Sequence, residues 1–198
     1  MVIFRKAGVE AAVMEAGLGG RYDATNVDYG RKLLSVITSV SLEHTQYLGN
    51  TEAGILEEKR RIVRNEPVVY NCMAPSLARM MKHEYGRRAF YAADICGVGE
   101  TRIFKEGLYA LVLLKDRNLL LKAAVAEPIQ AENIRTAVAA AEILKLRGLA
   151  LSDKDIIRGI MNMEMPARLS WDRRGYYVSV AHNPAAVTEM IKAVKKLH

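Results

Sequence analysis

The 198-residue chain has 51% hydrophobic and 26% charged residues, a composition that excludes a disordered protein and allows a sizeable core. Its net charge of +7 is spread along the chain, which is typical of a protein that binds phosphates or polycarboxylates. Only 7% of the residues are aromatic and no nucleic-acid module is recognisable, so we expect no nucleic-acid partner.

Apolar runs and cysteines indicate the compartment. The longest clean apolar runs, such as residues 108–114, are far shorter than the ~20 residues of a membrane helix. The N-terminus carries charges at Arg5 and Lys6, where a signal peptide is apolar. Cys72 and Cys96 lack metal spacing and are typical of buried thiols in a reducing compartment. We therefore predict a cytoplasmic protein without a membrane partner.

The most informative stretch is a glycine-rich loop near the N-terminus. An apolar run at residues 11–14 leads into Glu15 and then into three glycines within four residues. This pattern predicts a buried strand that ends in a loop whose backbone approaches something closely. In nucleotide-binding α/β folds, an acid at such a strand end holds the magnesium ion of ATP. The alternative is a glycine turn beside a solvated acid. A dinucleotide fingerprint fits worse, because Tyr22 occupies the third glycine position.

Strands and helices alternate along the first half of the chain. We expect strands at residues 32–41, 67–72 and 89–94, and helices at residues 51–64 and 75–87. This alternation predicts an α/β fold with a mostly parallel sheet flanked by helices.

The second half has a different pattern. Residues 102–125 predict an antiparallel flap of two or three strands joined by turns. Helices are expected at residues 129–147 and 152–162. A strand is expected at residues 176–181, followed by a helix that begins at residue 184.

The string Glu-Ala-Gly-Leu-Gly-Gly-Arg-Tyr-Asp-Ala-Thr-Asn, residues 15–26, closely resembles a signature of the folylpolyglutamate synthase and dihydrofolate synthase family. These proteins are Mur-type ATP-dependent amide ligases. The resemblance implies a partial ATP-binding central domain at residues 1–173 and the start of the C-terminal ligase domain at residues 174–198. It also implies ATP and Mg2+ as cofactors and an enzyme that joins glutamate to a folate or dihydropteroate carboxylate through an acyl phosphate.

The resemblance assigns metal ligands and a modified lysine. Glu15 and His44 would hold the metal, although imidazole is a poor ligand for magnesium. Glu43 replaces the aspartate that usually precedes that histidine, and the alternative for His44 is a structural loop histidine. Lys59 matches a lysine that is carbamylated in many of these ligases, which requires a neutral amine. Its alternative is a salt-bridged helix lysine, and Arg60-Arg61 stands where the family usually has Ala-Gly.

Three further residues match family positions. Asn133 resembles the asparagine that reads adenine, and Arg168 resembles the arginine that meets ATP phosphate. The alternative for Asn133 is a polar residue on an exposed helix face. His182 is expected near the incoming amino acid, or otherwise caps a helix. Ser179 stands where the family has an aspartate that helps to hold nucleotide, which removes a charge from this segment.

A phosphate-binding P-loop with Gly-Lys-Ser/Thr is expected upstream of Glu15, and this sequence does not contain it. The resemblance therefore implies that the N-terminal P-loop segment and most of the C-terminal domain are missing. We expect a piece of the ligase that is inactive alone. The alternative is a standalone remnant that acts as a nucleotide- or folate-binding or interaction module. We also expect an unpaired strand edge, covered by a homodimer or by a companion chain carrying the P-loop, unless residues 1–10 fold back as a strand.

Overall fold

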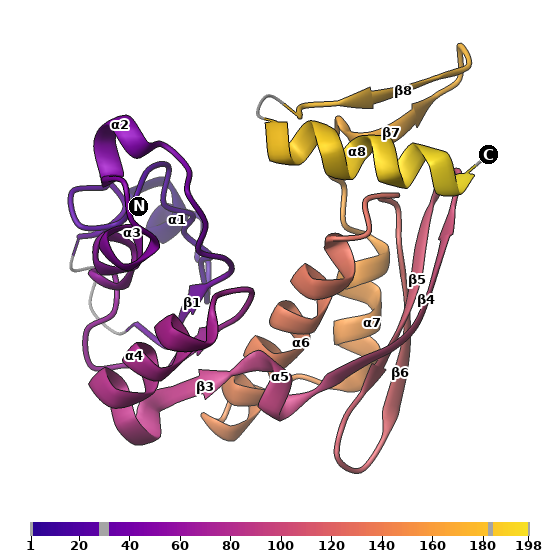
Figure 1. Cartoon of the computed structure of the whole chain (residues 1–198). Helices are drawn as coiled ribbons and strands as arrows, with labels where there is room; N and C mark the ends of the chain where they lie inside the picture. The colour runs from indigo at the N-terminus through magenta and orange to yellow at the C-terminus, as the bar shows by residue number, and fades with distance from the viewer. Residues whose placement is uncertain (1, 28–31, 182–183, 198) are drawn as a thin grey trace.

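The structure is a computed structural model that describes residues 2–27, 32–181 and 184–197. Its first half holds a parallel sheet in the order β1-β2-β3. Helix α3 connects β1 to β2, and α4 connects β2 to β3 (Figure 1). The bounds are α1 (Val2–Lys6), β1 (Ser35–Ile37), α2 (Thr45–Leu48), α3 (Glu52–Arg60), β2 (Val68–Tyr70), α4 (Pro75–Tyr85), the 3-10 helix η1 (Gly86–Arg88), β3 (Ala89–Tyr91) and α5 (Ala92–Ile95).

The second half holds two antiparallel sheets, one with the strand order β4-β5-β6 and one formed by β7 and β8. Helices α6 and α7 lie beside the first of these sheets, and α8 lies beside the β7–β8 hairpin (Figure 1). The bounds are β4 (Gly97–Phe104), β5 (Gly107–Leu113), β6 (Asn118–Ala123), α6 (Gln130–Leu146), α7 (Asp153–Met161), β7 (Arg168–Asp172), β8 (Tyr176–Ser179) and α8 (Pro184–Leu197).

Strand β2 is buried on both faces, which explains its unbroken apolar sequence. Successive side chains of a strand point to opposite faces of its sheet. Val68 therefore packs in the cluster that includes Leu56 of α3 and Met81 of α4, whereas Val69 packs in the cluster that includes Val138 of α6. The parallel sheet is thus the middle layer of three, with α3 and α4 on one face and α6 on the other.

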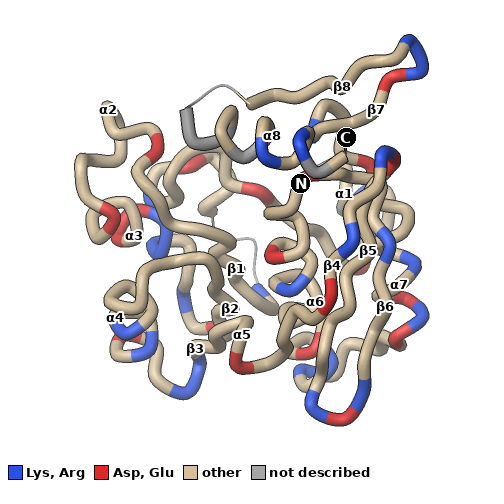
Figure 2. The backbone as a smooth tube through the Cα atoms, turned by 45° about the vertical axis from the view of Figure 1, so that its right-hand side comes forward, with Lys and Arg blue, Asp and Glu red and all other residues tan. Residues whose placement is uncertain are grey.

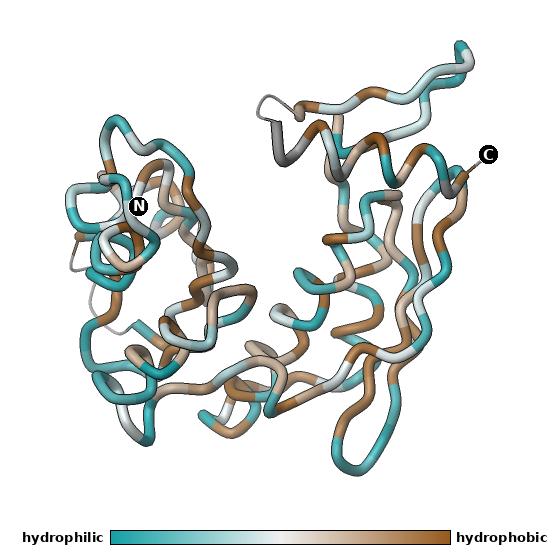
Figure 3. The backbone as a smooth tube through the Cα atoms, in the orientation of Figure 1, coloured by the Kyte–Doolittle hydropathy of each residue, from teal (hydrophilic) through white to brown (hydrophobic). Residues whose placement is uncertain are grey.

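Strand β6 is buried on one face only. Leu119 and Leu121 are buried, whereas Leu120 between them is 63% exposed. The buried residues belong to the cluster that also contains Ile134 of α6 and Ile156 of α7. Figure 3 shows apolar segments along the parallel strands and along the β4–β6 sheet, with polar turns between them. The two sheets thus share α6 as a common packing surface.

An ion-pair cluster fixes the turn between β5 and β6 to the helices. Arg117 donates from Nε to Oδ2 of Asp153 at 2.6 Å and from Nη2 to Oε1 of Glu142 at 2.8 Å. Lys145 contacts the same two carboxylates, each at 2.8 Å. Hydrogen bonds from Arg117 and then Lys145 lower the pKa of Asp153 to about 2. The charges of this cluster are therefore internally compensated, and its role is structural.

The N-terminal expectations are corrected by the structure. Residues 11–14 were expected to form a buried strand that ends at Glu15, but they form no regular element and their side chains are exposed. A strand is stable only when its backbone groups find a partner strand, and within the described residues this segment pairs with none. Residues 2–6 form helix α1 and so do not fold back as a strand. The expected strand at residues 32–41 is confirmed only as β1.

The expected α/β architecture is confirmed, because the parallel sheet with its flanking helices and the antiparallel flap are both present. Strands β7 and β8 pair across residues 173–175, and Trp171 packs edge-on against Tyr177. Backbone hydrogen bonds therefore connect the two sides of the domain boundary expected near residue 173. The division into residues 1–173 and 174–198 stays a prediction.

Both cysteines are free thiols. Cys96 is buried, and this burial raises the pKa of its thiol to about 11. Cys72 is only partly buried, so the expectation of two buried thiols is confirmed for Cys96 alone. Within the part of the chain that the structure describes, no helix is both long and apolar enough to cross a lipid bilayer.

Candidate functional site

Asp23 organises the glycine-rich segment at residues 15–26, which we call the glycine loop. Its Oδ2 accepts hydrogen bonds from the backbone N–H of Gly17 at 2.8 Å and of Leu18 at 3.1 Å. Its Oδ1 accepts from the hydroxyl of Thr25 at 2.6 Å and from the backbone N–H of the same residue at 2.9 Å. The Thr25 hydroxyl contributes most to lowering the pKa of Asp23 to about 2. Aspartate two residues before threonine is the local signal for such capping, although the sequence analysis assigns Asp23 no role.

The glycine loop packs on the end of α3. A Cβ added at Gly20 would lie 2.8 Å from Cγ2 of Ile62 and 2.9 Å from the carbonyl oxygens of Glu58 and Lys59. The N–H of Arg21 donates to the carbonyl of Glu58 at 3.1 Å. Sequence reasoning expected a close backbone approach here, and the structure shows that at Gly20 the close neighbour is the chain's own helix.

The two expected metal ligands, Glu15 and His44, both have exposed side chains. Glu15 lies in an irregular segment, so its expected place at a strand end is wrong. His44 precedes α2 in the left-handed conformation at φ 50°. Within the described residues, no group of three or more His, Cys, Asp or Glu side chains is arranged to hold a metal ion. Glu15 fits magnesium chemically only as one carboxylate among phosphate and water ligands, which Mg2+ commonly keeps.

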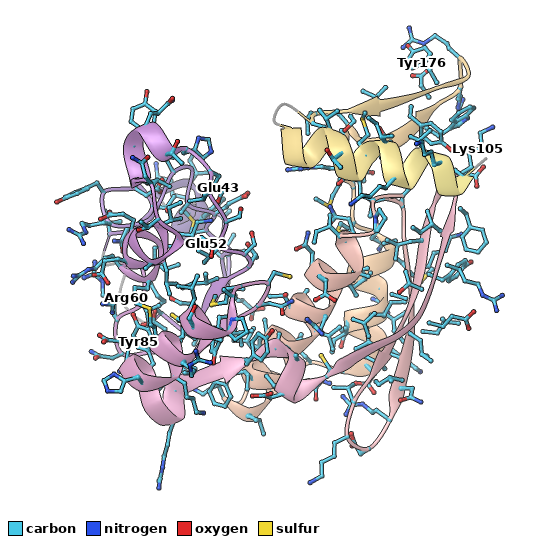
Figure 4. The ribbon with its side chains drawn as sticks, viewed as in Figure 1. Glu43, Glu52, Arg60, Tyr85, Lys105 and Tyr176 are labelled. Atoms are coloured by element: carbon cyan, nitrogen blue, oxygen red, sulfur yellow. The ribbon has the colours of Figure 1, made fainter. Side chains whose placement is uncertain are left out.

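Lys59 is held by an ion pair. Its Nζ lies 2.5 Å from Oε1 of Glu43 and donates to the carbonyl of Ser39 at 3.1 Å. Glu43 lies on the loop between β1 and α2 (Figure 4). The lysine side chain is only 19% exposed. The arrangement matches the alternative expected for Lys59, a salt-bridged helix lysine.

Asn71 joins the end of β2 to α6 in a buried network. Its amide donates to Oγ1 of Thr136 at 2.8 Å and to the carbonyl of Glu132 at 3.2 Å. Its Oδ1 accepts from Nη2 of Arg135 at 2.9 Å, and Arg135 also forms an ion pair with Glu132. This network is not predicted from the sequence. A polar residue directly after an unbroken apolar strand was the available signal.

Asn133 lies on the first turn of α6, next to this network. Its amide donates to Oε1 of Gln130 at 2.9 Å, and the residue is partly buried. The side chain of Asn133 is therefore less exposed than the alternative of a polar residue on an exposed helix face predicts. Adenine recognition by Asn133 stays a prediction.

Two family-like segments lie side by side in the β7–β8 hairpin. Arg168 pairs in register with Ser179, and the N–H of Val180 donates to the carbonyl of Ala167 at 2.8 Å. Arg168 is exposed, and Ser179 Oγ accepts from the N–H of Ala181 at 3.2 Å. A small hydroxyl thus closes a local turn where the family has a carboxylate. His182 lies outside the described residues.

Among the described residues, no hydrogen bond or ion pair joins two of the predicted site residues, and two of them instead contact residues that depart from the family pattern. Lys59 meets Glu43, and Arg168 meets the segment of Ser179. Among the contacts of the described residues, none joins Glu15 or His44 to Lys59. The metal roles of Glu15 and His44 stay predictions.

No protein-family model matches the chain. The chain is similar to the dihydrofolate synthase/folylpolyglutamate synthase of Bacillus subtilis, with 29% identity over 196 residues, which are 95% of this chain and 45% of the relative. It is similar to the Escherichia coli protein of the same name, with 31% identity over 202 residues, which are 98% of this chain and 44% of the relative. The chain thus spans less than half the length of these curated relatives.

Solved structures give the same result for the fold. The apo form of L. casei folylpolyglutamate synthase matches with a TM-score of 0.89 and 28% identity, covering 99% of this chain and 49% of that chain. The complex of the same enzyme with AMPPCP and folate matches with a TM-score of 0.88 and 28% identity over the same shares of each chain. These matches confirm the family resemblance drawn from residues 15–26 and the Mur-ligase type of α/β fold.

Proposed function

We propose that this chain, a relative of the folylpolyglutamate and dihydrofolate synthases, is part of an ATP-dependent ligase. The ligase joins glutamate to a folate or dihydropteroate carboxylate through an acyl phosphate. The observation that carries this proposal is the match of 99% of the chain to an enzyme structure in complex with AMPPCP and folate. A fold kept over the whole chain preserves the positions from which side chains reach a ligand, whereas fold alone does not establish activity.

Each predicted residue has a stated role in the proposed ligase. Asn133 reads the adenine edge, Arg168 binds a phosphate, and His182 lies near the incoming amino acid. Glu15 and His44 face Mg2+, which when bound neutralises charge on the transferring phosphoryl group. The basic groups of this chain add to that electrostatic stabilisation, which is the main catalytic contribution expected for phosphoryl transfer. The protein acts in the cytoplasm in this proposal.

Lys59 has two alternative states in the proposed ligase. In the present structure its ammonium is held by Glu43 and by the carbonyl of Ser39. Carbamylation requires a neutral amine and yields an anion, which the carboxylate of Glu43 would repel. The carbamate therefore requires that Glu43 move away from Lys59.

The second candidate function is a non-catalytic module that binds nucleotide or folate, or a protein partner. Two observations favour it. Lys59 is occupied by an ion pair, and Ser179 closes a local turn with Ala181 in place of a nucleotide-binding carboxylate. The sequence also contains no Gly-Lys-Ser/Thr to grip a triphosphate.

The test measures ADP release that depends on both glutamate and a folate substrate. The 198-residue chain alone should release none, because it has no P-loop. The chain mixed with the segment of the B. subtilis relative that it does not match should release ADP, and Arg168→Ala should abolish that release. The exposed Arg102→Ala is the matched control and should leave the release unchanged. Folded components that associate but give no turnover would favour the binding module.

A further inference from the structure

A hollow of about 300 Å³ lies between the glycine loop and the end of α3. It is lined by Arg21, Asn26, Arg61 and Arg64, which we call the arginine hollow. Arg21 and Asn26 come from the glycine loop, and the other two follow directly after α3. Lys59 points elsewhere, because its ammonium contacts Ser39 and Glu43. The hollow is therefore not lined by the residues predicted to perform ligase chemistry.

The arginines around the hollow share a small number of carboxylate partners. Arg61 contacts Oε1 of Glu57 at 2.6 Å, and Arg21 lies 3.7 Å from the same oxygen and 3.3 Å from Glu58. Glu57 also pairs with Arg60. Although partial burial opposes ionisation, hydrogen bonds from Arg60 and Arg61 lower the pKa of Glu57. One ionised carboxylate is thus shared by three guanidinium groups, and Figure 2 shows basic and acidic segments interleaved around α3.

Arg60 itself is directed away from the hollow and toward α4. Its Nη1 lies 2.9 Å from Oε1 of Glu84, and its carbonyl accepts from the hydroxyl of Tyr85 at 3.1 Å. Figure 4 shows Arg60 and Tyr85 on the same side of this part of the molecule. Arg60 therefore contributes to packing between two helices and leaves the hollow to its four lining residues.

Arg64 is the least compensated cation of the hollow. Its Nη2 donates to the neutral Oδ1 of Asn26 at 3.3 Å. Within the described residues, no carboxylate forms an ion pair with Arg64. The amide of Asn26 donates to the carbonyls of Arg21 at 3.2 Å and Arg61 at 3.3 Å, which holds the two walls together. Nε of Arg21 is buried and has no hydrogen-bond partner in the described part of the chain, which is unusual for a buried donor.

We propose that the arginine hollow binds an oxyanion, as the phosphate or carboxylate group of a small molecule. Guanidinium forks match the oxygens of both groups, and charge-assisted hydrogen bonds are the strong ones. A volume of about 300 Å³ is at the small end for ligand pockets. The site therefore accommodates the charged group and only a few further atoms of the molecule that bears it. Arg61 stands where the family resemblance expects glycine, so this wall of the hollow departs from the family pattern, whereas Arg21 and Asn26 belong to the family-like string at residues 15–26.

The test titrates the 198-residue chain with inorganic phosphate and, separately, with the dipeptide glutamylglutamate, at constant ionic strength set by chloride. Isothermal titration calorimetry gives the affinity, and the Nε–Hε resonances of arginine report the binding place by NMR. We expect saturable binding of one probe and shifts of the Arg21 and Arg64 resonances. Arg64→Gln should weaken binding by about tenfold, as the loss of a charge-assisted contact does. The tighter probe identifies whether phosphate or carboxylate is the natural group.

Arg102→Ala is the matched control, since Arg102 is 69% exposed and pairs only locally with Glu100. It removes the same charge far from the hollow and should leave both affinities unchanged. Arg64→Gln is preferred to a double variant because it removes the guanidinium charge and keeps part of the aliphatic side chain, so that it perturbs the fold least. The proposal is overturned if neither probe binds saturably, or if Arg102→Ala weakens binding as much as Arg64→Gln. Failure of the ligase assay would leave it standing.

Discussion

Oε1 of Glu43 lies 2.5 Å from Nζ of Lys59, and this ion pair joins the loop after β1 to the last turn of α3. The lysine amine also donates to the carbonyl of Ser39 at 3.1 Å, so two partners hold it. The residue that the family resemblance expects to be carbamylated is therefore held in an ion pair in this structure. Glu43 replaces an aspartate in the resembling motif, and the extra methylene lengthens its reach. The ion pair is the physical basis of the first prediction.

Glu43→Gln should increase carbamylation of Lys59. The change removes the ion pair and the charge that would repel a carbamate, while it keeps the size of the side chain. The measurement is the carbamate signal in ¹³C NMR of the chain in ¹³C-labelled bicarbonate. We expect a stronger signal in Glu43→Gln than in the unchanged chain, and no corresponding signal in Glu43→Gln combined with Lys59→Ala. An equally strong signal with Glu43 intact would show that the ion pair does not oppose the modification.

Asp23→Asn should loosen the glycine loop. The native carboxylate accepts from two backbone amides and from Thr25, and an amide side chain cannot accept at both of its ends. Amide hydrogen exchange at Gly17 and Leu18 should become faster, whereas exchange in β2 should stay unchanged. Unaltered exchange at the Gly17 and Leu18 amides would show that the Asp23 carboxylate does not order the glycine loop.

The same carboxylate predicts a pH dependence. The pKa of Asp23 is lowered from 3.8 to about 2 in the folded chain. A depressed acid pKa contributes stability that is present above the unfolded value and is lost as pH falls through the folded value. Protection of the loop amides should therefore decline between pH 3.8 and about 2 in the unchanged chain. Asp23→Asn should show no such decline, because it has no proton to take up.

Much of the fold was predictable because its signals are local and redundant. Residues 68–70 are continuously apolar, and they form the strand that is buried on both faces. The helix expected at residues 152–162 is present as α7, and Ser152 and Asp155 form a reciprocal capping box at its start. Residues 11–14 are just as apolar, yet they form no strand, because a strand also requires a partner that a local pattern does not encode. The one-turn helices α2 and α5 were missed because four residues carry few signals.

The candidate site was less predictable from the sequence. The glycines predicted a close approach correctly, but no local pattern indicates whether a ligand or the protein's own helix is the neighbour at Gly20. The Glu43–Lys59 pair and the Asn71–Arg135 contact join residues that are 16 and 64 positions apart. Such contacts depend on how the layers stack, which follows from the whole fold.

Gly20→Ala should destabilise the chain. The added Cβ would lie 2.9 Å from two backbone carbonyl oxygens of α3, which cannot rotate away as a flexible side chain does. Overpacking of this kind typically costs about 1–3 kcal/mol. Gly159→Ala in α7 is the matched control, because its added Cβ meets nothing within 4 Å. Alanine has the better helix propensity, so that variant should gain about 0.5–1 kcal/mol. Urea unfolding measures both, and a neutral Gly20→Ala would mean that the loop does not pack on α3 in solution.

The last prediction is that the chain associates in solution. Strand β1 pairs with β2 on one side, and within the described residues its other edge has no partner. The segment before it exposes large apolar side chains, with Ile3 77% exposed and Val13 fully exposed. An unpaired strand edge beside exposed apolar residues favours pairing with another chain. We therefore expect a homodimer, or a complex with a companion chain, at low micromolar concentration, and light scattering measures the mass.

Two variants distinguish association through this edge from nonspecific association through exposed apolar side chains. Val13→Asp should shift the chain toward the monomer, because it puts a charge in the segment that we expect to be covered. Leu146→Asp is the matched control, since Leu146 is 80% exposed at the far end of α6 and should not affect the mass. A single monomeric species of the unchanged chain with a sharp cooperative melt would contradict the prediction. It would mean that the chain itself covers the edge of β1. Neither a second copy nor a companion chain would then be needed to pair the backbone N–H and C=O groups of that edge.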